Sequence, residues 1–291
     1  MFQTNTASYR EWRAAKLESY PTSAADLVTE VGGLTDLSAA QKGVILSNCR
    51  RANMAIYTCR DTSVDRKAIR MFAAQFGLRR LDHHLCANED GVSELTVATE
   101  GVRGDYVPYS SRSLSWHTDG YYNAEPRRLQ AVLLHCAQDA AKGGQNALLD
   151  PEIAYLHLRD SNPDYIAAFE HQECMEIPAN NGADGEIRPA VSGPVFWYDA
   201  TSGALRMRYS ARKKNIRWRN DAVTTAAREC LSELLGDEGG PVLRFKLRPG
   251  QGLISNNVLH NRTAFEDTEE QPRLLYRVRF FDSITGGEEG T

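Results

Sequence analysis

Short runs rich in β-branched and aromatic residues, separated by Gly, Asn, Asp and Pro, fill most of the sequence from about residue 93 onward. Residues 95–97, 131–134 and 195–198 are examples. Runs of this length between turn-forming residues are typical of β-strands. Many short strands at this spacing predict a barrel or sandwich core, so we expect a mainly β fold with flanking helices.

Helical patterns precede and interrupt these predicted strands. Apolar residues recur at helical spacing in residues 39–54, 65–76, 151–170 and 221–235. We therefore expect residues 7–80 to be mainly helical and the last two segments to be helical insertions among the strands. No repeat or low-complexity linker divides the chain. The prediction is a single catalytic domain over residues 1–291, in which a helical region at 1–64 packs on a core at 65–282.

Composition and charge limit the functions and partners that fit this chain. With 42% hydrophobic and 25% charged residues, it resembles an ordinary globular protein. A formal net charge of -4 gives no field that attracts polyanions, so we expect no nucleic-acid partner. The sequence has neither a recognisable signal peptide nor 18 consecutive apolar residues, so no membrane partner is expected. The six cysteines form no C-x-x-C pair, which favours a reduced, cytoplasmic setting. A homo-oligomer is also a possible state for a protein of this kind.

His117 and Asp119 lie two residues apart in the segment SLSWHTDGYYN. On an extended chain their side chains point to the same side and can hold one ion together. His260, in ISNNVLHNRTAF, can supply a third ligand. Two imidazoles and one carboxylate are the ligand set of non-haem Fe(II) oxygenases, which leaves coordination positions open. An H-x-D pair alone also occurs by chance, so its context has to carry the assignment.

Four separated blocks supply that context: SLSWHTDGYYN, GGQNALLD, LRPGQGLISNNVLHNRTAF and RLLYRVRFF. In this order they resemble the taurine dioxygenase and γ-butyrobetaine hydroxylase family over about residues 65–282. The resemblance implies a double-stranded β-helix, which is a jelly-roll, cupin-like core. It also implies Fe(II) as the metal, with 2-oxoglutarate and O2 as cosubstrates, and oxidation of a C–H bond of a small molecule with release of succinate and CO2.

The same resemblance implies roles for residues outside the metal triad. Arg273 would pair with the distal carboxylate of 2-oxoglutarate, a bidentate contact that suits a guanidinium. Asn146 stands where the family usually has Thr, and its amide can donate the same hydrogen bond. Arg277, four residues after Arg273, would meet an anionic group of the substrate, although an outward-facing Arg is the alternative. Because Asp119 is retained as a carboxylate, halogenation is not expected.

Four further residues are candidates for substrate contact. Tyr121 and Phe265 flank the metal ligands and would line the pocket, or would be core aromatics. His83 lies near a family segment that contributes a substrate-contacting His, although a surface pair with His84 fits as well. Arg212 belongs to the most basic stretch, MRYSARKKNIRWRND, which is either a solvated face or a source of cations for an acidic substrate.

Two other functions remain open at this point. A hydrolase or isomerase could use the same two histidines and one carboxylate to hold Zn(II) and activate water. A barrel that binds a small molecule without catalysis is the second alternative. Arg273 argues against the hydrolase, which needs no cation placed for a 2-oxo acid.

Overall fold

The computed structural model describes residues 7–61, 63–98, 100–104, 106–182 and 185–285. The chain divides into two compact units. The first comprises residues 1–20, 115–128 and 149–242, and the second comprises residues 21–114, 129–148 and 243–291. Each unit therefore combines segments that are far apart in the sequence.

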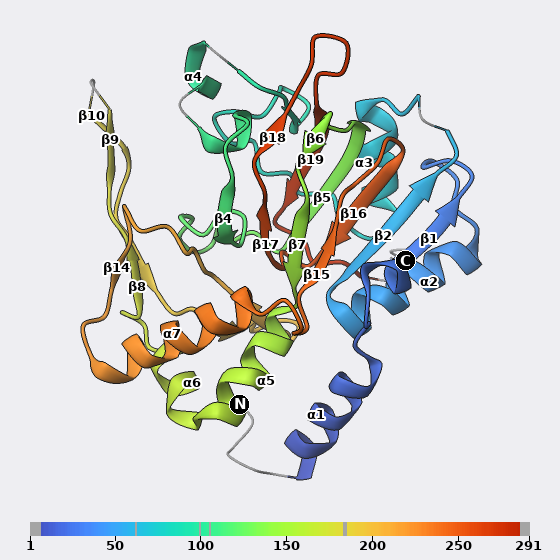
Figure 1. Ribbon diagram of the computed structural model, residues 1–291. Coiled ribbons are helices and arrows are strands. Elements are labelled where there is room, and N and C mark those ends of the chain that lie inside the picture. The colour runs from blue at the N-terminus through green and yellow to red at the C-terminus, as the bar shows by residue number, and fades with distance from the viewer. Residues whose placement is uncertain (1–6, 62, 99, 105, 183–184, 286–291) are drawn as a thin grey trace. The chain divides into compact units, whose positions relative to one another are not determined.

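The second unit contains a six-stranded sheet (Figure 1). In order across the sheet, its strands are β1 (Val28–Val31), β2 (Met54–Cys59), β16 (Gln251–Ser255), β5 (Ala131–Gln138), β19 (Leu274–Phe280) and β3 (Val92–Leu95). β1 and β2 pair in parallel, whereas the other neighbours pair antiparallel. The sheet thus joins the beginning, middle and end of the sequence through backbone hydrogen bonds.

Two helices share an apolar core with one face of this sheet. Ser38 caps α2 (Ala39–Ala52) by accepting a hydrogen bond from the Gln41 amide, and Asp65 caps α3 (Arg66–Ala74) in the same way. The core contains Ile45, Cys49, Tyr57, Ile69, Phe72, Phe76, Leu133, Ile254, Val278 and Phe280. Burying each large apolar side chain contributes roughly 1.5–3 kcal/mol, so this core fixes which face of the sheet is covered.

Because side chains alternate along a strand, the residues between those of the core point to the opposite face of the sheet. In β19, Tyr276, Val278 and Phe280 belong to the core shared with the helices or pack against it. Arg277 and Arg279 alternate with them and point away from this core, although both are buried. A single strand therefore carries apolar residues on one face and guanidinium groups on the other.

A smaller sheet and several short elements complete the second unit. The strands β15 (Leu243–Phe245), β7 (Asn146–Leu149) and β17 (Leu259–Arg262) are consecutive in the smaller sheet, and β18 (Phe265–Glu266) pairs with β6 (Lys142–Gly143). The short helices are η1 (Ala24–Leu27), α4 (Gly101–Gly104) and η2 (Val107–Tyr109). Gly143 has a φ of 67°, and a Cβ there would lie 2.2 Å from the Ala264 carbonyl oxygen, so only glycine fits this turn.

Helices dominate the first unit. They are α1 (Ala7–Ser19), α5 (Pro151–Ser161), α6 (Pro163–Phe169) and α7 (Ala222–Gly236), and the last three contact one another (Figure 1). The buried Lys16 of α1 lies 2.6 Å from Asp150 and 2.5 Å from Glu152 at the start of α5. Losing one partner of such a buried pair costs roughly 3–5 kcal/mol, so these contacts hold α1 in place.

The strands of the first unit are short. β4 (Leu114–His117) enters it, β8 (Met175–Ile177) pairs with β11 (Val191–Gly193) and β14 (Arg217–Trp218), β9 (Asn180–Gly182) pairs with β10 (Gly185–Arg188), and β12 (Phe196–Tyr198) pairs with β13 (Leu205–Met207). Each has four residues or fewer. Apart from β4, the described strands of this unit form ladders of two or three strands.

The mainly β character and the flanking helices are confirmed, with one difference in the N-terminal region. The helices expected at 39–54 and 65–76 occur as α2 and α3, but β1 and β2 interrupt the segment that was expected to be mainly helical. α2 ends because Asn53 adopts a left-handed conformation with a φ of 55°, so Met54 begins a strand. Among the described residues, no helix is both long enough and apolar enough to span a membrane.

Stability should fall in mild acid because of His135. This residue of β5 is fully buried, its Nδ1 lies 3.0 Å from the Tyr57 hydroxyl, and burial lowers its pKa from 6.5 to about 4. Between these values the unfolded chain binds the proton and the folded chain does not, so the free energy of unfolding decreases as the pH falls, by about 2 kcal/mol from pH 7 to pH 5. Urea unfolding at both pH values should show this loss in the wild type and a clearly smaller one in His135→Gln. His157→Gln, which alters an exposed residue, should keep the wild-type slope.

Gly252 should not tolerate a methyl group. A Cβ at this position of β16 would lie 2.1 Å from the Tyr57 ring, which is fully buried and cannot move aside. Gly252→Ala should therefore reduce the free energy of unfolding by roughly 1–3 kcal/mol. Gly43→Ala is the matched control, because nothing lies within 4 Å of a Cβ there and alanine favours the interior of α2. A Gly252→Ala protein as stable as the wild type would contradict the close packing.

Candidate metal centre and adjoining pocket

His117 ends β4, and the segment around it is held against residues 209–211 of the same unit. The amide of Thr118 donates to the Tyr209 carbonyl at 3.0 Å, and that of Ala211 donates to the Trp116 carbonyl at 2.8 Å. His117 and Ser210 form an isolated antiparallel bridge between these contacts. The backbone that carries His117 is thus fixed on both sides.

The His117 ring is oriented by its own backbone. Its Nδ1 lies 2.8 Å from the Ser115 carbonyl oxygen, and because a carbonyl only accepts, Nδ1 must carry the proton. Nε2 lies 4.0 Å from Oδ1 of the buried Asp119. The two side chains lie on the same side of the chain, as the H-x-D spacing predicted.

His260 has the same local arrangement in β17. Its Nδ1 donates to the Val258 carbonyl oxygen at 2.9 Å, so the ring is again oriented by the backbone two residues before it. Asn257, in a left-handed turn with a φ of 50°, precedes this segment and bonds the Leu129 carbonyl. Outer hydrogen bonds of this kind are characteristic of metal-ligating histidines.

One ligand atom from each of His117, Asp119 and His260 lies within 4.8 Å of the others. The set offers two imidazole nitrogens and one carboxylate oxygen, which suits a divalent transition metal and leaves sites for further ligands. These are the three residues that the sequence analysis predicts as metal ligands, and their role stays a prediction.

Tyr121 and Arg212 adjoin His117. The rings of Tyr121 and His117 meet edge to face with centroids 6.4 Å apart, and Arg212 Nη1 donates to the Tyr121 hydroxyl at 3.2 Å. Arg212 is otherwise exposed. An exposed guanidinium thus lies two contacts away from a candidate metal ligand.

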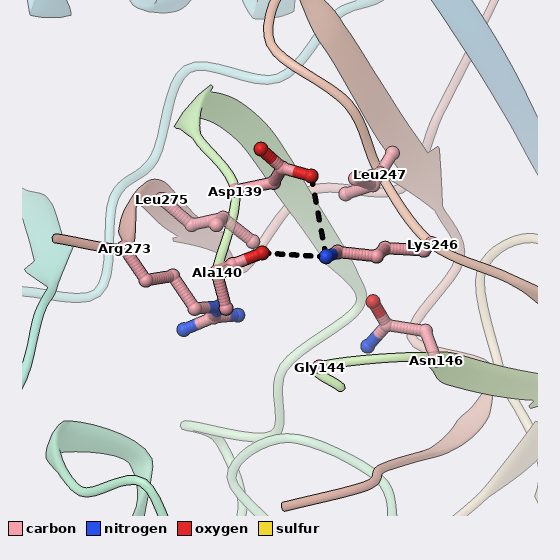
Figure 2. A pocket seen from close by; sticks show the side chains of 8 residues that line it. All are labelled: Asp139, Ala140, Gly144, Asn146, Lys246, Leu247, Arg273 and Leu275. Carbon is pink, nitrogen blue, oxygen red and sulfur yellow. Dashed lines mark hydrogen bonds and ion pairs between the residues drawn. The ribbon is translucent and has the colours of Figure 1, made fainter. Parts of the chain in front are cut away.

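Arg273 lines a small pocket in the second unit (Figure 2). The pocket is lined by Asp139, Ala140, Gly144, Asn146, Lys246, Leu247, Arg273 and Leu275. Arg273 is only 4% exposed, and among the described residues no carboxylate forms an ion pair with it. Burial lowers the pKa of Arg273, because desolvation disfavours the charged form. A buried cation of this kind calls for an anionic ligand.

The Phe265 ring packs against the guanidinium group of Arg273. Its ring lies 4.9 Å from the Arg273 guanidinium carbon and 4.7 Å from that of Arg262. Arg262 is fixed by donating to the carbonyls of Ser110, at 2.8 Å, and Arg112. Burial, and then the charge of Arg273, lower the pKa of Arg262 to about 9. Both guanidinium groups thus lie close to the Phe265 ring.

Asn146 is partly engaged by the backbone. Its Nδ2 donates to the Asn261 carbonyl at 3.3 Å, while Asn261 Oδ1 accepts from the Ala147 amide at 3.2 Å. An amide nitrogen has two N–H groups, so the second one can serve a ligand in the pocket that Asn146 lines.

The remaining two candidates are Arg277, in β19, and His83. Arg277 is 7% exposed and faces Ser93 of β3 in the register of the sheet. His83 is exposed, whereas His84 is partly buried and its Nε2 lies 3.0 Å from the Ser93 hydroxyl. Of the two histidines, His84 therefore has the contact that links it to the strand facing Arg277.

Sequence reasoning missed Lys246, whose amine lies in the pocket with Arg273 (Figure 2). The residue follows β15 in the stretch LRFKLRPG, where charged and apolar residues alternate. Such a pattern usually indicates a half-exposed strand, so it gave no reason to single out this lysine. Arg262 was also missed. Charged residues are seldom fully buried, so the sequence gave no reason to expect this arginine inside the protein.

Comparison with known proteins gives a consistent picture. The sequence model described as taurine catabolism dioxygenase TauD, TfdA family matches residues 56–279. A putative alpha-ketoglutarate-dependent taurine dioxygenase from Burkholderia xenovorans is 19% identical, with a TM-score of 0.61 over 94% of this chain and 92% of that one. AAD-2, solved with Mn(II) and N-oxalylglycine, is 16% identical, with a TM-score of 0.59 over 88% and 93%. PvcB from Pseudomonas aeruginosa is 14% identical, with a TM-score of 0.57 over 87% and 84%.

Proposed function

We propose that this chain, which belongs to the taurine catabolism dioxygenase TauD, TfdA family, oxidises a C–H bond of a small anionic molecule and releases succinate and CO2. Membership of the family makes it an Fe(II)- and 2-oxoglutarate-dependent dioxygenase that uses O2. Its substrate is accordingly a small molecule, and the proposal adds the anionic character and the products.

The fold proposal follows from the sheets. We infer that the six-stranded sheet and the sheet containing β15, β7 and β17 form the double-stranded β-helix core of a single catalytic domain, 1–291. Antiparallel pairing between strands that are distant in sequence supports this inference, because a jelly-roll is built from such pairs.

The observation that carries the proposal is the proximity of His117, Asp119 and His260, with ligand atoms within 4.8 Å of one another. These residues would hold Fe(II), and the two imidazoles, each oriented by a hydrogen bond from Nδ1, together with the Asp119 carboxylate fit that role. When bound, the iron together with 2-oxoglutarate and O2 supplies the oxidising chemistry. The protein's part is to orient the three donors and to leave the other coordination positions open.

Arg273 and Asn146 are proposed to bind 2-oxoglutarate. The buried guanidinium without a carboxylate partner suits the distal carboxylate, and Phe265 keeps it in place. The free N–H of Asn146 suits the same ligand. A Zn(II) hydrolase does not bind a 2-oxo acid, so the buried charge of Arg273 would have no carboxylate to pair with. The dioxygenase is therefore favoured over the hydrolase and over a non-catalytic barrel.

Substrate contact is assigned to Arg277, Arg212, Tyr121, Phe265 and His83. Two of these are cations, which favours an anionic group on the substrate. Arg212 contacts Tyr121 beside His117, and this is the closest structural support for a role near the metal. A cytoplasmic location, the absence of nucleic-acid and membrane partners, and a homo-oligomer as a permitted state belong to the same proposal.

The metal assignment is tested by removing its carboxylate. Anaerobic addition of Fe(II) and 2-oxoglutarate to the wild type should produce the weak visible charge-transfer band of the chelate. Asp119→Ala should bind Fe(II) at least roughly tenfold more weakly and lose most of the band, because only the two imidazoles remain. Asp160→Ala, which alters an exposed carboxylate on α5, should behave as the wild type. Unchanged iron affinity in Asp119→Ala would remove Asp119 from the ligand set.

The cosubstrate assignment is tested at Arg273. Arg273→Gln keeps a polar side chain but removes the charge, so the KM for 2-oxoglutarate should rise roughly 10- to 100-fold. Succinate release, measured with a panel of sulfonates, betaines, amino acids and carboxylates, identifies a substrate and then gives this constant. Arg60→Gln, at a side chain that is 80% exposed, is the matched control. An unaltered KM in Arg273→Gln would exclude the proposed contact.

A further inference from the structure

Lys246 supplies a second cation to the pocket that contains Arg273 (Figure 2). Its side chain is 20% exposed, so most of it is removed from water. Both cations and the Asn146 amide line the same pocket, which also contains one carboxylate, Asp139. The charged groups lining the pocket therefore sum to a net positive charge.

The hydrogen bonds of Lys246 leave one of its donors available. Nζ donates to the Ala140 carbonyl at 2.6 Å and lies 3.3 Å from Asp139 Oδ2. An ammonium group has three N–H donors. Among the described residues no other partner contacts it, so the third N–H can bind a ligand in the pocket.

Asp139 does not depend on Lys246 for its partners. Arg248 donates to the same Oδ2 at 2.9 Å, and Gln271 donates to Oδ1 at 3.1 Å. Burial raises the pKa of Asp139, but the bonds from Arg248 and Lys246 outweigh it and hold this pKa below its usual value. The carboxylate is thus charged at neutral pH and remains bonded if Lys246 is replaced.

Arg248 provides an internal comparison. It also binds Asp139, but its side chain is 65% exposed and it does not line the pocket. If Lys246 served only to neutralise Asp139, then Arg248 could do the same from the solvent side. What distinguishes Lys246 is its place beside Arg273.

We propose that Lys246 is a specificity-determining residue, which donates its third N–H to the distal carboxylate of the 2-oxo acid alongside Arg273. This rests on the proposed binding of 2-oxoglutarate in this pocket. Two cations make the pocket selective for 2-oxo acids with a second carboxylate, because a neutral chain end would leave both charges unpaired. The pocket therefore recognises the charge as well as the length of the cosubstrate.

The test compares Lys246→Met with Arg248→Met by anaerobic titration of the Fe(II) protein. Lys246→Met should bind 2-oxoglutarate about tenfold more weakly, the loss expected for one hydrogen bond to a charged group. It should bind 2-oxovalerate, which lacks the distal carboxylate, at least as tightly as the wild type does, because one cation fewer is left unpaired. Arg248→Met should keep both affinities. Lys246→Arg, which retains a cation, should recover most of the 2-oxoglutarate affinity.

Each outcome separates this inference from the function on which it rests. A wild type that binds neither 2-oxo acid overturns both. A wild type that binds 2-oxoglutarate, with equal binding by Lys246→Met, overturns only the role of Lys246. An equal loss for both 2-oxo acids would also overturn it, because Lys246 would then act through the shape of the pocket. Lys246→Gln replaces Lys246→Met in this comparison if thermal unfolding shows that the methionine variant does not fold.

Discussion

The packing of α2 and α3 against one face of the six-stranded sheet is the interaction on which the rest of the second unit depends. It removes Tyr57, Phe72 and Phe76 from water and thereby fixes the orientation of every strand in the sheet. Because side chains alternate along a strand, covering one face commits the intervening residues to the other face. A slip of one residue in β19 would bring Arg277 into the apolar core, so the register is strongly specified.

The buried guanidinium groups are the electrostatic counterpart of this core. The guanidinium carbons of Arg262 and Arg273 lie 4.7 Å and 4.9 Å from the Phe265 ring centroid, and burial of two neighbouring like charges opposes folding. Arg262 is compensated by backbone carbonyls, whereas Arg273 is compensated by no carboxylate among the described residues. The site therefore holds a charge ready for a ligand, and the ligand would stabilise the protein as it binds.

Much of the fold and of the candidate site can be predicted from the sequence. The helices α2 and α3, the closing strand and the grouping of His117, Asp119 and His260 follow from spacing and from the family resemblance. Local patterns do not reveal β1, which is only four residues long and is stabilised by its neighbour β2. They also cannot show that Lys246 shares a pocket with Arg273, since that proximity is created by tertiary packing.

The shared hydrogen-bonding pattern of His117 and His260 determines how the two rings respond to substitutions elsewhere in the chain. Each ring donates to a carbonyl only two residues before it, so much of its orientation is held within three consecutive residues. Substitutions elsewhere can then accumulate without turning the rings. A substitution at a distant position is therefore expected to change the surroundings of these rings more readily than their orientation.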